Sequence, residues 1–121
     1  MIGQLLLAIV LSGIGLASCT YHTNDYDPCV LPAEVSFEMD IIPIFEASCI
    51  DGGCHNGTIP PNLTRDVAYA SLVGGGYVVP GTPAEDNSLY QVIDGGSMQG
   101  YATDCERTFI KQWLDEGALD N

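Results

Sequence analysis

Two cysteines and a histidine lie within seven residues of the chain, in the segment Cys49-Ile50-Asp51-Gly52-Gly53-Cys54-His55. Thiols and imidazoles this close together suit a disulfide, a metal or a covalently attached cofactor. A domain with fewer than about 80 ordered residues usually needs one of these in addition to its apolar core. The two glycines allow extra length between the thiols to bulge outward. This segment therefore constrains the fold more than any other part of the sequence.

The segment fits three kinds of chemistry. Covalent haem needs two thiols that reach the vinyl groups on one porphyrin edge and a histidine, next to the second thiol, that reaches the iron. Four residues separate Cys49 from Cys54 instead of the usual two, a less common variant of the c-type haem motif. A zinc site needs a fourth ligand, which only His22, Cys29 or Cys105 can supply. A Cys49–Cys54 disulfide is the third alternative. The residue pattern favours one covalent haem c and leaves the other two open.

The rest of the sequence predicts short helices joined by long loops. With 14 glycines and 7 prolines among 121 residues, much of the backbone must be turn and loop. Asp40 is expected to cap a first helix, and Thr103-Asp104-Cys105-Glu106 matches a capping box before an apolar stripe that includes Trp113. We expect a single all-α domain. Its predicted helices cover residues 40–47, 66–72, 84–93 and 104–116.

The first 18 residues have the pattern of an export leader. Residues 2–18 carry no charge, and the apolar stretch 5–16 is short for a membrane span. The stretch ends in Leu16-Ala17-Ser18-Cys19, which resembles the lipobox of bacterial lipoproteins, although the usual basic residue before it is missing. We therefore expect a signal peptide at 1–18, a lipidated Cys19 and a polar tether at 19–33. The expected location is the bacterial cell envelope, on a membrane that faces the periplasm or the exterior. An uncleaved anchor or a buried helix is the alternative.

The charge is strongly one-sided. The chain has 16 acidic and 3 basic side chains, a formal net charge of -13, and all of these charges lie after residue 18. Such a field repels phosphate backbones and anionic lipid headgroups, so nucleic acid is not expected as a partner. It favours protein partners that present a basic face.

From Val35 to Ala118, roughly two thirds of the chain, the order of features resembles the small cytochrome c domains of exported bacterial proteins. No single feature is specific, but their order and spacing together are. The matching features are Asp40-Ile41-Ile42-Pro43-Ile44-Phe45, Cys54-His55-Asn56-Gly57, Ala68-Tyr69, Val79-Pro80-Gly81-Thr82-Pro83, Ser88-Leu89-Tyr90, Met98, Ile110, Trp113 and Glu116-Gly117-Ala118.

The resemblance implies a cytochrome c domain over residues 34–121, with three to four short helices around one covalent haem. It implies that His55 is the proximal iron ligand and that Met98 is the distal one. In the family a proline commonly follows this methionine, whereas this chain has Gln99. His22 or an open position is the alternative to Met98. Two strong axial ligands favour single-electron transfer and leave no place for a small-molecule substrate.

Cys29 and Cys105 remain once lipid and haem have been assigned. An even remainder in an exported domain favours a disulfide, and members of the family often carry a cysteine at the start of the last helix. Two free thiols are the alternative, with Cys105 made more acidic by the helix amino terminus.

We expect an electron carrier and not an enzyme, with redox proteins as partners. Two other functions are compatible with the sequence. One is a non-catalytic surface lipoprotein whose domain is stabilised by zinc or disulfides. The other is a haem sensor or peroxidase subunit with an open iron position.

Overall fold

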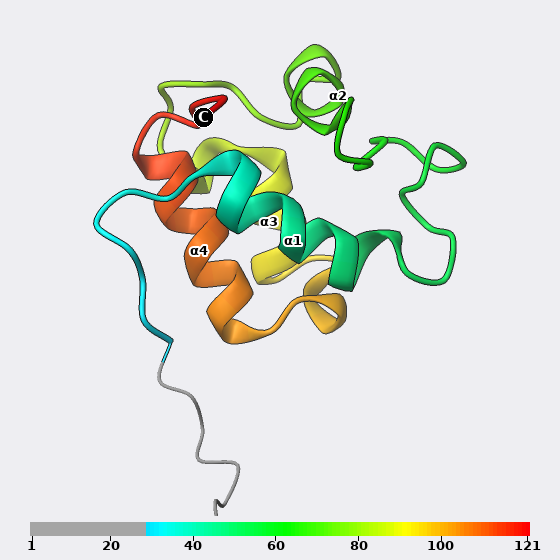
Figure 1. Cartoon of the computed structure of the whole chain (residues 1–121), viewed down its shortest axis with the longest axis horizontal. Helices are drawn as coiled ribbons and strands as arrows, with labels where there is room; N and C mark the ends of the chain where they lie inside the picture. Colours follow the sequence, from blue (N-terminus) through cyan, green and yellow to red (C-terminus); the bar gives the residue numbers. More distant parts are fainter. Residues whose placement is uncertain (1–28) are drawn as a thin grey trace, which may run out of the picture.

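The computed structural model describes residues 29–121. The predicted leader, Cys19 and His22 lie outside the described residues, so the lipid anchor stays a prediction. The described part contains short helices and no strand, which confirms an all-α, loop-rich fold (Figure 1). None of its helices is long and apolar enough to cross a membrane. The elements are η1 (Phe37–Ile41), α1 (Ile42–Phe45), η2 (Glu46–Ile50), α2 (Ala68–Gly74), η3 (Ala84–Asp86), α3 (Ser88–Asp94), η4 (Gln99–Tyr101) and α4 (Asp104–Asp115).

The first three elements follow one another without a break and form one helical stretch. It begins at Phe37, three residues before the expected start. Ser36 is the cap: its Oγ accepts a hydrogen bond from the Met39 amide at 3.1 Å, and the Ser36 amide donates to Asp40 Oδ2 at 2.8 Å. The prediction that Asp40 caps this helix was wrong, because the cap is Ser36. Asp40 lies inside the first turn, where its carboxylate accepts from the Ser36 amide. Hydrogen bonding around Pro43 is partly of the wider π type, which suits a residue without an N–H.

This first helical stretch lies against α4 (Figure 1), and a cluster of aromatic side chains joins the two. The ring of Phe37 lies 5.0 Å from Trp113 and 5.3 Å from Tyr69, measured between centroids. Phe37, Phe45 and Trp113 are buried, and burial of large aromatic rings dominates the energetics of a core this small. The polar atoms of the cluster are satisfied too: Trp113 Nε1 donates to the Leu119 carbonyl and the Tyr69 hydroxyl donates to the Ala118 carbonyl, both at 2.9 Å.

The segment before η1 is fixed to α4 and to the residues that follow it. The Val35 amide donates to Glu116 Oε2 at 2.9 Å, and the Phe37 amide donates to Asn121 Oδ1 at 2.8 Å. Cys29 and Cys105 form a disulfide with a sequence separation of 76, so the expected pairing is present. On the chain-entropy model, a disulfide that closes a loop of this length stabilises the fold by about 4 kcal/mol.

The last helix agrees with its prediction, while the third departs from it. Both hydrogen bonds of the capping box are present at the start of α4, and Gly117, at φ +111°, follows its end. The helix expected at 84–93 is instead divided into η3 and α3 by Asn87, whose backbone is extended. Asn87 is buried, and its side chain accepts from the Val79 amide at 2.6 Å and donates to the Pro83 carbonyl at 2.8 Å. Asn87 binds the preceding loop from an extended backbone conformation, and this conformation interrupts the helix.

Candidate cofactor site

A pocket of about 490 Å³ opens between the Cys49–His55 segment on one side and α3 with the Met98 segment on the other. Most of its lining is apolar, and its volume falls in the range of about 300–1,000 Å³ that is typical of ligand and cofactor sites. Cys49, Cys54, His55 and Met98 all line this pocket. The main apolar side chains among the other lining residues are Ile59, Leu63, Leu89, Val92, Ile93 and Tyr101.

The cysteine segment forms a tight loop directly after η2. The Gly53 amide donates to the Ile50 carbonyl at 3.0 Å, and the His55 amide donates to the Cys49 carbonyl at 3.1 Å. Gly52 and Gly53 have φ values of +81° and +84°, a region that other residues adopt only with strain. Both glycines are exposed and neither lines the pocket, whereas Asp51, directly before them, does.

The His55 ring is held by the backbone that follows it. Its Nδ1 lies 3.1 Å from the carbonyl oxygens of both Ile59 and Pro61. Because both neighbours are acceptors, Nδ1 must carry the proton, and in the neutral ring Nε2 then has the free lone pair. Histidines that bind metals are oriented in this way by a second hydrogen bond from the other ring nitrogen. The loop is fixed further by the Leu63 amide, which donates to the His55 carbonyl at 2.8 Å.

The two thiols of the segment are free and differ in exposure. Cys49 is half-buried, and Cys54 is exposed. Burial, with smaller contributions from the negative charges of Glu106 and Cys54, raises the pKa of the Cys49 thiol to about 11. Cys49 is therefore protonated at neutral pH and is a poor nucleophile as the free side chain. This environment does not suit a redox-active thiol.

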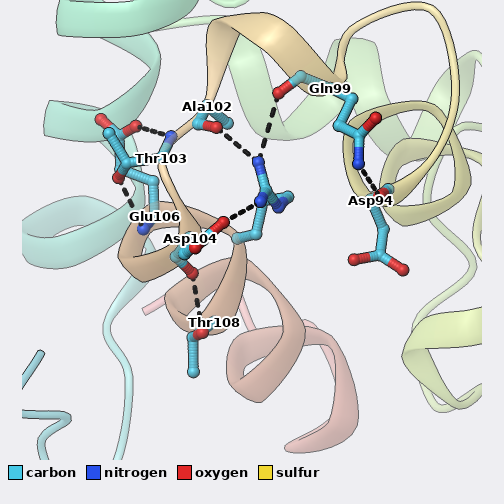
Figure 2. A network of polar contacts seen from close by, with 8 residues as sticks. Asp94, Gln99, Ala102, Thr103, Asp104, Glu106 and Thr108 are labelled. Carbon is cyan, nitrogen blue, oxygen red and sulfur yellow. Dashed lines mark hydrogen bonds and ion pairs between the residues drawn. The ribbon is translucent and has the colours of Figure 1, made fainter.

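Met98 is half-buried and belongs to a short loop that is held in place by hydrogen bonds. The Met98 amide donates to the Val92 carbonyl at 2.9 Å. Gln99 Nε2 donates to the Asp94 carbonyl at 2.9 Å (Figure 2). The Arg107 guanidinium, on α4, donates to the carbonyls of Gln99 at 3.2 Å and Ala102 at 2.6 Å. Gln99 thus has a structural role of its own in the Met98 loop.

Several residues of the site were not predicted from the sequence. Tyr77 and Tyr101 line the pocket, and Arg107 holds the Met98 loop. Their partners lie on other elements, so no local pattern marks them. Gly75 gives a partial signal for the position of Tyr77, because a Cβ at position 75 would lie 2.6 Å from the Tyr77 ring and a side chain there would displace the ring.

The other chemistries suggested by the cysteines find less support in residues 29–121. Cys29 and Cys105 are joined to each other and cannot serve as zinc thiolates. Within this part of the chain, no group of three or more His, Cys, Asp or Glu side chains lies close enough together to hold a metal ion. Cys49 and Cys54 do not form a disulfide.

The fold and the site together define a small all-α domain in which a loop with two thiols and one histidine borders an apolar pocket. No family model and no curated protein matches the chain. Among solved structures it is similar to Kuenenia stuttgartiensis hydrazine synthase, with 27% sequence identity and a TM-score of 0.57. The match covers 69% of this chain but only 16% of that one, so the chain corresponds to a small part of the hydrazine synthase chain.

The environment of Cys49 predicts slow alkylation in the cofactor-free protein. In a Cys54→Ala variant, the alkylation rate of Cys49 should rise about tenfold per pH unit from pH 8 to 10, because the thiolate fraction grows until the pH reaches about 11. Mass spectrometry with iodoacetamide measures this rate, and unfolded protein serves as the control. A rate that levels off near pH 9 would contradict the assignment.

Proposed function

We propose that this domain is a single-electron carrier that holds one haem c in the described pocket. Cys49 and Cys54 are the attachment points, His55 is the proximal iron ligand and Met98 is the distal ligand. The observation that carries the proposal is the His55 ring, whose Nδ1 is bound by two backbone carbonyls beside two free cysteines at the edge of an apolar pocket. This arrangement leaves Nε2 available to a metal.

The residues present fit such a group in three respects. The pocket is large and mostly apolar, as the body of a porphyrin requires. The cysteines lie next to it on one loop, and a thioether-bearing side chain, Met98, lines it from a separate segment. The loop of Met98 is fixed by Arg107 and Gln99, which supports a defined position for its sulfur. The likeness to part of hydrazine synthase supports the choice of fold.

Bound haem iron would supply the reversible one-electron chemistry. The protein's own residues then have limited tasks: Leu63, Leu89 and Ile93 would exclude water, and His55 and Met98 would be the two side chains that hold the iron. With both side chains bound, no site would remain for a substrate, so transfer of single electrons is the expected activity.

Covalent haem attachment is the first test. Co-expression with haem maturation machinery should give wild-type protein that keeps its haem on a denaturing gel and has a haemochrome spectrum. A C49A/C54A variant should lose covalent haem completely, because both thioether bonds are gone. The C29S/C105S variant is the control for loss of two cysteines: it loses the stability that the disulfide provides but keeps both attachment thiols, so the protein that folds should retain haem. Wild-type protein that contains zinc, or no iron, would refute the proposal.

The role of Met98 is tested separately. A Met98→Ala variant should have a lower reduction potential and, when reduced, should bind carbon monoxide, because a thioether ligand raises the potential and its loss opens the iron. Met39, which is 75% exposed on the first helical stretch, provides the control variant Met39→Ala, which should behave as wild type. If the Met98→Ala and wild-type spectra are identical, the distal ligand is another residue or the position is open.

The proposed redox partners present a basic face. All three cationic side chains of the protein are already in ion pairs with its own carboxylates: Arg65 with Glu38 and Glu46, Arg107 with Asp104, and Lys111 with Glu85 and Asp115. Among residues 29–121, no Lys or Arg side chain is therefore left unpaired where a partner approaches the acidic surface. Complementary charge accelerates encounter, and salt screens it.

Electron transfer to a basic protein partner should accordingly slow as salt rises. We expect a fall of about tenfold or more between low and physiological ionic strength, within the range of electrostatic steering. Stopped-flow absorbance of the haem measures the rate, and an acidic redox protein of similar potential is the control, whose rate should rise with salt. Equal salt dependence for the two partners would contradict a basic docking face.

A further inference from the structure

One carboxylate, that of Glu106, joins the start of α4 to the end of η2. Its Oε2 accepts from the Thr103 amide at 2.7 Å while Thr103 Oγ1 accepts from the Glu106 amide at 3.2 Å, which closes the capping box (Figure 2). Its Oε1 accepts a 2.7 Å hydrogen bond from Ser48 Oγ. The cap needs only Oε2, so the hydrogen bond that Oε1 accepts from Ser48 is additional to what the helix requires.

Ser48 is the residue before Cys49, and both line the cofactor pocket. The negative charge of Glu106 lies close enough to the Cys49 sulfur to contribute, after burial, to its raised pKa. The neighbouring cation, Arg107, is committed to Asp104 and to the carbonyls of the Met98 loop. Among residues 29–121, no ion pair neutralises Glu106. The disulfide at Cys105 holds the same turn of α4 in place.

We infer that Glu106 is a positioning residue that holds the Ser48–Cys49 end of η2 and keeps a negative charge beside the cofactor edge attached at Cys49, which lowers the reduction potential. The inference rests on the proposed function. Oxidised haem iron carries one more positive charge than reduced iron, so a nearby carboxylate stabilises the oxidised form. Hydrogen bonding, charge and burial near the cofactor are the means by which a protein sets this potential.

A Glu106→Gln variant separates charge from structure. The amide has nearly the same shape, accepts the Thr103 bond through its oxygen and donates to Ser48 through its nitrogen. We expect covalent haem and a melting temperature close to wild type, together with a higher reduction potential measured by spectroelectrochemical titration. Glu116→Gln is the matched control: Glu116 is also half-buried at an end of α4 and accepts from a backbone amide, that of Val35, but it accepts no hydrogen bond from a residue that lines the pocket, whereas Glu106 accepts one from Ser48.

The potential decides the inference. A Glu106→Gln potential equal to wild type, or an equal rise in Glu116→Gln, would overturn it, because the effect would then be absent or merely due to total charge. If wild-type protein carries no covalent haem, the proposed function fails instead. The positioning role is then decided in cofactor-free protein by a double-mutant cycle of S48A and E106A in urea unfolding: coupling between the two is expected, and additive effects would overturn that role.

Discussion

The contact between Phe37 and Trp113 is the interaction on which the rest of the structure depends. It joins the first helical stretch to the last helix, and the Tyr69 ring adds α2 to the same cluster. Residues more than 70 positions apart are thereby brought together, so the intervening chain must return on itself as loops. The disulfide and the hydrogen bonds of Val35 and Phe37 reinforce this closure at its edge. These contacts hold the helices in place but do not fill the space between the Cys49–His55 segment and α3, and this space is the pocket.

This division explains how so small a domain can leave a large apolar pocket. The aromatic cluster supplies one compact core, whereas Val92 and Tyr101 face the pocket and are 36% and 64% exposed. Exposed apolar groups around a hollow contribute nothing to folding until something covers them. A planar apolar cofactor in the pocket would bury these surfaces and so stabilise the fold.

Local features were predictable from the sequence, and non-local ones were not. The α4 capping box lies within four consecutive residues and was placed correctly, and the all-α, loop-rich class was also predicted correctly. The first helix was misplaced because Ser36 and Asp40 are both good caps, and the choice between them depends on Phe37 packing against distant Trp113. Asn87 interrupts the helix predicted over residues 84–93 because its side chain binds the Val79–Pro83 loop, a contact that the local sequence pattern does not show. The Cys49, Cys54 and His55 cluster was visible as a motif, whereas Arg107 and the Ser48–Glu106 bond join separate elements and leave no mark in the local pattern.

The net charge of -13 acts differently at short and long range. At short range the three cations each hold a segment in place: Arg65 fixes the loop before α2 to the first helical stretch, Arg107 fixes the Met98 loop, and Lys111 links α4 to η3. Because these pairs involve every Lys and Arg side chain of residues 29–121, the remaining carboxylates of this part of the chain present an uncompensated field to a partner at long range. Glu106 acts at both ranges: it accepts hydrogen bonds from Ser48 and Thr103, and no cation among residues 29–121 forms an ion pair with its charge. For the proposed electron carrier the two effects have different sources: removing surface acids such as Glu116 would weaken the encounter with a basic partner and leave the potential unchanged, whereas removing the charge of Glu106 would raise the potential.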